Sequence, residues 1–290
     1  MKLLLPLLFL FTNAIIAQNN TAAISKRTDT IHSAILNEDR YIWVHIPAKA
    51  ERVSSKQSYP VIYVLDGQVH FDEVNNILSR ISKETGKDVA NEMIVVGIGN
   101  IWQRYKDYSP THISSSPWVD SNNASIKGGG EKFISFLEKE LIPHINATCP
   151  SSPTRILIGH SMGGLIAMDI LLNHTNLFDY YAAIDPSMWW DERKLLQQAK
   201  TILSNKLFEK KSLFLAVANT IDKNMDVAHI KADTSSQTVL IRPSLTLLED
   251  INASKQNKLR FDWKFYKDHD HMTVLPAAAY DALKFFLKYL

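Results

Sequence analysis

The chain has 290 residues, of which 46% are hydrophobic and 21% charged, so it can bury a full core and is not predominantly disordered. Its 32 Lys and Arg residues against 30 Asp and Glu residues leave a net charge of +2, which is too balanced for a surface that binds nucleic acid throughout. The single cysteine, Cys149, excludes an internal disulfide framework and a multi-cysteine zinc or iron–sulfur site.

The first residues have the pattern of a secretory signal. Lys2 supplies a positive charge, an apolar run covers residues 3–16, and Ala17-Gln18 offers a cleavage point after a small residue. The run is short for a transmembrane helix, which needs about 20 apolar residues. We therefore expect a signal peptide over residues 1–17, export to the periplasm or out of the cell, and one mature domain over residues 18–290 without stable membrane insertion. An uncleaved anchor is the alternative.

Short β-rich runs alternate with segments of helical periodicity, which predicts an α/β protein with helices flanking a central sheet. The first two runs surround Asn37-Glu38-Asp39-Arg40 and predict an antiparallel hairpin, whereas the later, continuously apolar runs predict buried parallel strands. The expected strands cover residues 28–36, 41–46, 61–65, 93–98, 155–158, 181–184, 212–217 and 259–266.

Three segments have a clear helical pattern, namely residues 131–146, 161–173 and 276–290. Pro143 is expected to tighten the last turn of the first of these helices, and Pro276 suits the start of the third. The Ser- and Asn-rich stretch over residues 114–130 is the longest expected loop and a candidate for a pocket rim.

The sequence Gly159-His160-Ser161-Met162-Gly163-Gly164 matches G-x-S-x-G between an expected strand and an expected helix. In that context the motif predicts a sharp turn that holds Ser161 in a strained conformation above the sheet, at the positive end of the helix. Small residues at positions 159 and 163 allow the strand and the helix to approach each other. Ser161 is therefore the candidate nucleophile, although an ordinary helix cap at this position is the alternative.

A serine hydroxyl needs a base to remove its proton, and in α/β-hydrolases the base follows late in the chain. His269 and His271 lie between the last expected strand and the last expected helix. We choose His271. The same His-x-His pair suits a metal ion, but no third ligand is evident and no metal is predicted.

The acid that orients the histidine is expected on the loop after the strand at residues 212–217. Asp222 and Asp226 both qualify, and spacing does not distinguish them. For the oxyanion hole, the backbone N–H of Met162 is one expected donor, and the amide of Gly67 or Gln68 is the other. Gly67 permits an unusual backbone conformation there, with an ordinary tight turn as the alternative.

Together these residues resemble the putative-esterase branch of the α/β-hydrolases, which includes enterochelin, feruloyl and acetylxylan esterases, S-formylglutathione hydrolase and mycolyltransferases. The resemblance spans nearly the whole mature chain, and the residue after His271 departs from it, since the family commonly has Gly or Asn where this chain has Met272. The landmarks are residues 64–67 (VLDG), Arg104, 107–110 (DYSP), 140–143 (ELIP), 159–164 (GHSMGG), 185–190 (DPSMWW), 271–274 (HMTV), Pro276 and 280–281 (YD).

The resemblance implies a mostly parallel sheet of about eight strands and an acyl-transfer mechanism that requires no cofactor. Ser161 attacks an ester carbonyl, His271 moves the proton, and water releases the acyl group. Arg104, Trp189 and Trp190 are the candidate substrate-binding residues, with an Arg104–Asp107 ion pair and core packing of the tryptophans as the alternatives.

The resemblance points to a small-molecule ester as the partner: a siderophore, a carbohydrate-linked ester or another small ester. The second hypothesis is an acyltransferase on the same fold, and the third is a catalytically silent binding module.

Overall fold

The computed structural model describes residues 26–47, 57–100, 104–112, 128–221 and 225–290. The expected signal peptide, most of the expected loop over residues 114–130, and Asp222 lie outside these ranges. Eight strands form one sheet in the order β1-β2-β4-β3-β5-β6-β7-β8. Their bounds are β1 Lys26–Ser33, β2 Glu38–His45, β3 Tyr59–Val64, β4 Ile94–Ile98, β5 Ser151–His160, β6 Tyr180–Ile184, β7 Ser212–Ala218 and β8 Arg260–Tyr266.

All eight expected strands are present, and their directions agree with the apolar pattern. Strands β1 and β2 form the predicted antiparallel hairpin, whose turn includes Asn37 at a positive φ of 56°. Strand β2 pairs antiparallel with β4, whereas every pairing among β3 to β8 is parallel. The C-terminal ends of the parallel strands therefore meet at one edge of the sheet, where α/β folds place their ligands.

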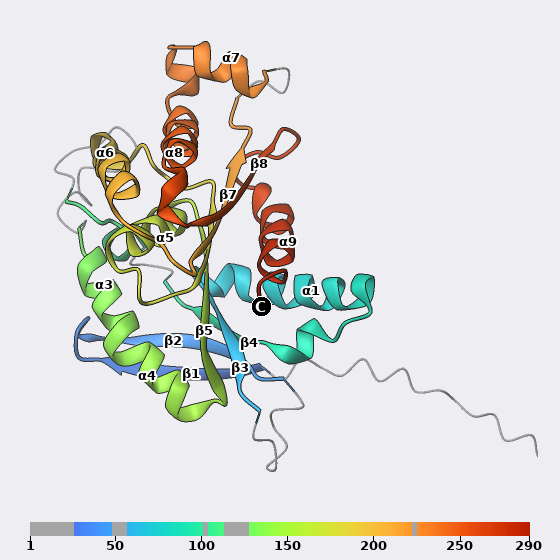
Figure 1. Cartoon of the computed structure of the whole chain (residues 1–290). Helices are drawn as coiled ribbons and strands as arrows, with labels where there is room; N and C mark the ends of the chain where they lie inside the picture. The colour runs from blue at the N-terminus through green and yellow to red at the C-terminus, as the bar shows by residue number, and fades with distance from the viewer. Residues whose placement is uncertain (1–25, 48–56, 101–103, 113–127, 222–224) are drawn as a thin grey trace, which may run out of the picture.

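Helices cover both faces of the sheet (Figure 1). On one face, α1 and α9 enclose an apolar cluster with the sheet; on the other, α3, α4, α5, α6 and α8 enclose the larger part of the core. The helices are α1 Gly67–Thr85, α2 Arg104–Asp107, α3 Gly130–Phe136, α4 Ile142–Thr148, α5 Met162–Asn173, α6 Trp190–Asn205, α7 Val227–Ala232, α8 Arg242–Ala253 and α9 Val274–Phe286. Short 3-10 helices cover Val89–Glu92, Ser236–Thr238 and Lys255–Asn257. Within the described residues, no helix has both the length and the apolar character needed to cross a membrane.

The helix expected over residues 131–146 is present but not uniform. A π-helical turn, Leu137–Leu141, separates α3 from α4. The prediction that Pro143 tightens the last turn of the helix is wrong. Pro143 lies at the start of α4, just after the π-helical turn. Because proline has no backbone N–H and crowds the preceding turn, it interrupts the regular helical ladder at this point.

Candidate active site

The turn from β5 into α5 has the strained geometry that the motif predicts. Ser161 has φ 61° and ψ −119°, a backbone conformation that residues other than glycine rarely adopt. A Cβ atom at Gly159 would lie 2.1 Å from the carbonyl oxygen of Gly163, so the strand can meet the helix only with glycine there. At Gly163 the same atom would make an ordinary 3.5 Å contact with Leu65, so the close approach requires only the first glycine.

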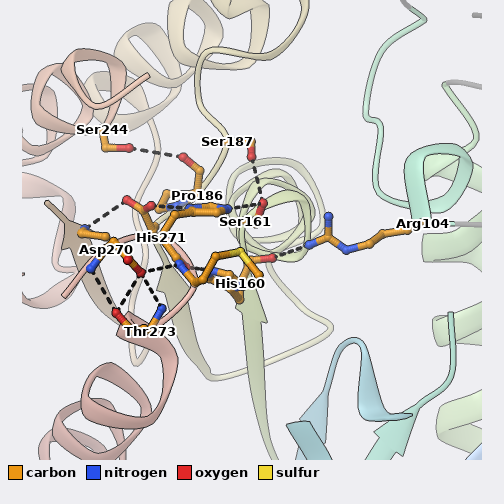
Figure 2. A network of polar contacts seen from close by, with 12 residues as sticks. Arg104, His160, Ser161, Pro186, Ser187, Ser244, Asp270, His271 and Thr273 are labelled. Atoms are coloured by element: carbon orange, nitrogen blue, oxygen red, sulfur yellow. Dashed lines mark hydrogen bonds and ion pairs between the residues drawn. The ribbon is translucent and has the colours of Figure 1, made fainter. Parts of the chain in front are cut away.

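Ser161, His271 and an aspartate that the sequence did not identify form one continuous chain of polar contacts. The Oγ atom of Ser161 lies 3.0 Å from Nε2 of His271, and Nδ1 of the same ring lies 2.6 Å from Oδ2 of Asp185. Figure 2 shows Ser161 and His271 facing each other, with Ser187 on the far side of the serine hydroxyl at 3.4 Å. This is the arrangement expected of an activated serine nucleophile.

Strand register explains why Asp185 reaches the histidine. In the parallel pair β5–β6, His160 lies opposite Ile184, so Ser161 and Asp185 each follow the end of a neighbouring strand. Asp185 has a positive φ of 41°, and its other oxygen, Oδ1, accepts the backbone N–H of Ala218 at 3.1 Å. Both carboxylate oxygens therefore have partners, which fixes the group toward His271.

The structure contradicts Asp226 as the acid. Its carboxylate caps α7, where it accepts the backbone N–H of His229 at 2.9 Å and lies 2.8 Å from Nδ1 of the same residue. Helix α7 lies beyond α8 and the sheet, away from α5 (Figure 1). The other candidate, Asp222, lies outside the described residues. The sequence predicted the acid after β7, whereas the aspartate that contacts His271 follows β6. The Asp185-Pro186-Ser187 landmark of the family was the one feature in the sequence that pointed to this position.

His269, the alternative base, does not contact Ser161. Its ring packs edge-on against Tyr266, with 6.1 Å between the centroids, although the residue lines the same cavity as His271. Asp270, which lies between the two histidines, forms a local hydrogen-bonded turn with Met272 and Thr273 just before α9. There Asp270 Oδ1 accepts the backbone N–H groups of Met272 and Thr273 at 3.0 and 2.9 Å.

An open cavity of about 880 Å³ lies over Ser161, within the size range of sites for drug-sized ligands. Its lining includes Arg104, Trp189, Ile221, Leu240 and Met272. Met272, next to His271, is 79% exposed, so the position that departs from the family pattern presents its side chain at the mouth of the site.

Two of the three expected substrate-binding residues line this cavity, and the third does not. Trp190 is 2% exposed and stacks on Tyr105 at 5.9 Å, so its predicted substrate contact is wrong and it belongs to the core. Trp189 lines the cavity, as does Arg104. The alternative pairing of Arg104 with Asp107 is also wrong, because Arg104 Nε donates to Asp66 Oδ2 at 3.0 Å, while Asp107 pairs with Arg40.

The expected oxyanion residues lie at two helix starts. Met162 is the first residue of α5 and lines the cavity. Gly67 and Gln68 begin α1 but are not among the described residues that line it, and the Gln68 side chain accepts the backbone N–H of Asn100 at 3.1 Å. The unusual backbone belongs to Asp66, with φ 53°, rather than to Gly67. Gly67 is needed for space, since a Cβ there would lie 2.4 Å from the carbonyl carbon of Gly97.

Metal-ligating side chains gather elsewhere. Among the described residues, Glu131, Asp169 and His174 bring their ligand atoms within 4.8 Å of one another, away from the His269–His271 loop. Glu131 is exposed, and Asp169 already accepts a hydrogen bond from Asn173 at 2.7 Å. We assign no metal to this group.

An eight-stranded, mostly parallel sheet with a strained serine turn and a late histidine loop defines an α/β-hydrolase. The chain belongs to the family described as "Putative esterase", whose model matches residues 33–277. The ferri-bacillibactin esterase BesA of Bacillus subtilis is 25% identical over 260 residues, which are 87% of this chain and 86% of BesA.

Solved structures agree with this fold. An IroE-like serine hydrolase from Shewanella oneidensis is 30% identical with a TM-score of 0.79, over 91% of this chain and 80% of that one. The siderophore hydrolase EstA from Aspergillus nidulans, at 21% identity, has a TM-score of 0.75 over 97% of this chain and 99% of its own. The protein is thus an ester-bond hydrolase by family.

Proposed function

We propose that the protein hydrolyses carboxylic esters through an acyl-enzyme on Ser161, with His271 as the base and Asp185 as the acid. The continuous contact from Ser161 Oγ through His271 to Asp185 carries this proposal. An ionised carboxylate can only accept a hydrogen bond, so in this mechanism the imidazole proton of His271 is on Nδ1 and is donated to Asp185. Nε2 is then free to accept the serine proton.

In the first half-reaction, Ser161 Oγ forms a bond to the ester carbonyl carbon while its proton moves to His271 Nε2. The tetrahedral intermediate collapses when the carbon–alkoxy bond breaks, and the leaving alcohol takes that proton. In the second half-reaction, a water molecule loses a proton to Nε2 and attacks the acyl carbon. The acid product leaves, and the proton returns to Ser161. Asp185 stabilises the imidazolium formed in both halves.

The oxyanion of each intermediate needs hydrogen-bond donors and a positive electrostatic environment. Met162 supplies its backbone N–H, since the first amides of a helix have no partner within that helix. The positive end of the α5 dipole points to the same place. A backbone amide at the start of α1, from Gly67 or Gln68, is the second donor that we propose.

The test compares wild type with Ser161→Ala on short-chain p-nitrophenyl esters, together with labelling by a fluorophosphonate probe. We expect turnover and labelling of the wild type and neither in the variant. His271→Ala should be nearly inactive, whereas His269→Ala should retain much of the activity. Turnover by Ser161→Ala comparable to wild type would contradict the assignment. An added alcohol that outcompetes water for the acyl group would instead indicate an acyltransferase.

For the substrate, we propose an ester bond of a siderophore. The names of the relatives supply the support: BesA is a ferri-bacillibactin esterase, and a protein of Aspergillus fumigatus, 29% identical over 159 residues, is a siderophore triacetylfusarinine C esterase. The cavity of about 880 Å³ over Ser161 is open enough for part of such a large molecule to enter. Incubation of the enzyme with bacillibactin, triacetylfusarinine C and a feruloyl ester, followed by mass spectrometry, should show ester cleavage in a siderophore first.

We also propose that the protein is exported. The support is the sequence of residues 1–17, with its Lys2 start and apolar run. Expression of the full chain, cell fractionation and intact-mass measurement should recover a protein that begins at Gln18. A full-length chain in the membrane fraction would instead indicate the uncleaved anchor.

A further inference from the structure

The segment that carries His271 is mostly exposed, so burial of its own side chains does little to fix its backbone. Its carbonyl groups are nevertheless held at alternate positions. Asn219, directly after β7, donates its Nδ2–H group to the carbonyl oxygen of Lys267 at 3.0 Å and its backbone N–H to that of His269 at 2.9 Å. The third carbonyl in this series is that of His271.

His160 holds this third carbonyl. The residue ends β5, immediately before Ser161, and its Nε2 lies 2.8 Å from the carbonyl oxygen of His271 (Figure 2). A carbonyl oxygen only accepts, so the imidazole must donate from Nε2–H. His160 is 8% exposed, and burial, with the neighbouring charges, lowers the pKa of its imidazole to about 3. The ring is therefore neutral at neutral pH, and its one proton is committed to this bond.

The His160 backbone is fixed as well. Its carbonyl oxygen accepts Nη2–H of Arg104 at 3.0 Å, and Arg104 is itself paired with Asp66. The His160 and His271 rings pack with 4.6 Å between their centroids and a tilt of 37°. The donor thus comes from the end of β5, which Arg104 also contacts, and bonds to the mostly exposed segment that carries His271.

From this geometry we infer that His160 is a positioning residue: its Nε2–H bond to the His271 carbonyl holds the His271 imidazole between Ser161 and Asp185. The inference rests on the proposed function, because it concerns the base of that mechanism. The Nε2 proton of His160 does not move during the reaction, and His160 contacts no reacting atom. Its effect is on geometry, and a displacement of about 1 Å in an active site can cost about 100-fold in rate.

The test compares two replacements of similar size. In His160→Gln, the side-chain amide can place an N–H near the former Nε2, whereas His160→Leu removes the donor. For His160→Leu we expect kcat on p-nitrophenyl esters to fall about 10- to 100-fold while KM stays within about twofold. His160→Gln should recover most of the lost kcat. This split and this rescue separate positioning from a general loss of packing.

His70→Leu is the matched control. The His70 ring also lies against His160, edge-on at 6.0 Å, but bonds to no atom of the His271 segment among the described residues. We expect its kcat to stay within about twofold of wild type. A His160→Leu enzyme with wild-type kcat, or a His160→Gln enzyme no faster than the leucine variant, would overturn the inference.

A second measurement needs neither activity nor a variant that folds. Nitrogen-15 NMR of the histidine rings in the wild-type protein should show His160 as the neutral tautomer with its proton on Nε2. A proton on Nδ1 would overturn the inference even if the esterase mechanism holds. Conversely, an active Ser161→Ala enzyme would refute the proposed function and leave the tautomer of His160 as found, so the two failures are distinguishable.

Discussion

Two residues with positive φ angles bring the proposed catalytic groups together. Ser161 and Asp185 have φ values of 61° and 41°, and they follow the ends of the adjacent strands β5 and β6. Such conformations cost about 1–3 kcal/mol each and persist only where the surroundings enforce them. Here the backbone N–H of Ser161 donates to Ile184 and that of Ser187 donates to Ser161, which links the two turns.

Replacement of the acid should separate Asp185 from the aspartate that the sequence suggested. We expect Asp185→Asn to lower kcat by at least about 100-fold, because an amide can hold the wrong tautomer of His271. Asp226→Asn should stay within about twofold of wild type, since that carboxylate is exposed and caps α7. Steady-state kinetics of both variants provide the check, and a larger loss in Asp226→Asn would contradict the structure.

The two glycines of the serine turn should respond differently to alanine. Gly159→Ala forces a Cβ to 2.1 Å from a backbone oxygen that cannot move without shifting α5. We expect it to destabilise the fold by about 3 kcal/mol or more, or to prevent folding. Gly163→Ala makes only ordinary contacts and should change the free energy of unfolding by less than about 1 kcal/mol. Urea unfolding measures both, and equal losses would show that the steric argument fails.

At the scale of elements, the π-helical turn connects the helical layer to the N-terminal hairpin. Glu140 lies in this turn, and its Oε1 accepts the backbone N–H groups of Ala34 and Ile35 at 3.0 and 3.2 Å. Its Oε2 accepts the hydroxyl of Ser33 at the end of β1. One carboxylate thereby satisfies three donors of the β1–β2 connection.

We expect Glu140→Ala to lower the free energy of unfolding by about 1–3 kcal/mol, because it leaves several donors without their charged acceptor. Glu138→Ala is the matched control, since this exposed residue lies in the same turn and differs from Glu140 in its surroundings. The control should change stability by less than about 0.5 kcal/mol. Chemical unfolding of the pair tests this difference, which should vanish if Glu140 is only a surface charge.

Elements differed in how well the sequence predicted them. Strands rich in Val, Ile and Leu were predicted correctly, and so was α5, because burial on both faces requires apolar runs. Helix α1 was not predicted, although Val74, Ile77, Leu78 and Ile81 recur on one face and are buried against the sheet. The π-helical turn before Pro143 was not predicted either, because local helix propensity does not specify where an extra residue is inserted into a helical turn.

At the scale of the whole molecule, parallel strands gather distant residues at one edge of the sheet. Arg104, Ser161, Asp185 and His271 come from four separate connections and line the same cavity. A second long-range contact, the buried pair of Arg40 on β2 and Asp107 on α2, connects the antiparallel part of the sheet to the segment that carries Arg104. Both side chains are almost fully inaccessible to solvent.

This pair should give stability a distinctive pH dependence. Burial raises the pKa of Asp107 to about 6, although Arg40 opposes the shift. An unfolded aspartate has a pKa of about 3.9. Between about pH 4 and 6 the folded state therefore binds more protons than the unfolded state, and the contribution of Asp107 to stability falls as pH rises.

Asp107→Asn removes this titration and isolates its effect. The free energy of unfolding of wild type minus that of the variant should decrease between pH 4.5 and pH 6.5, as measured by urea unfolding at each pH. Groups common to both proteins cancel in this difference. A difference that increases with pH would show that the ion pair with Arg40, rather than burial, controls the carboxyl.

The sequence by itself determined the α/β class, the eight strands, the serine turn and the histidine loop of this protein. These features depend on local patterns: apolar runs, glycines flanking Ser161, and a histidine between a strand and a helix. Only the tertiary structure decided that Asp185 contacts His271, that Trp190 is buried, that Arg104 pairs with Asp66, and that His160 bonds to the His271 carbonyl. Each of these depends on strand order and register, which place residues far apart in the chain beside one another and leave no local mark in the sequence.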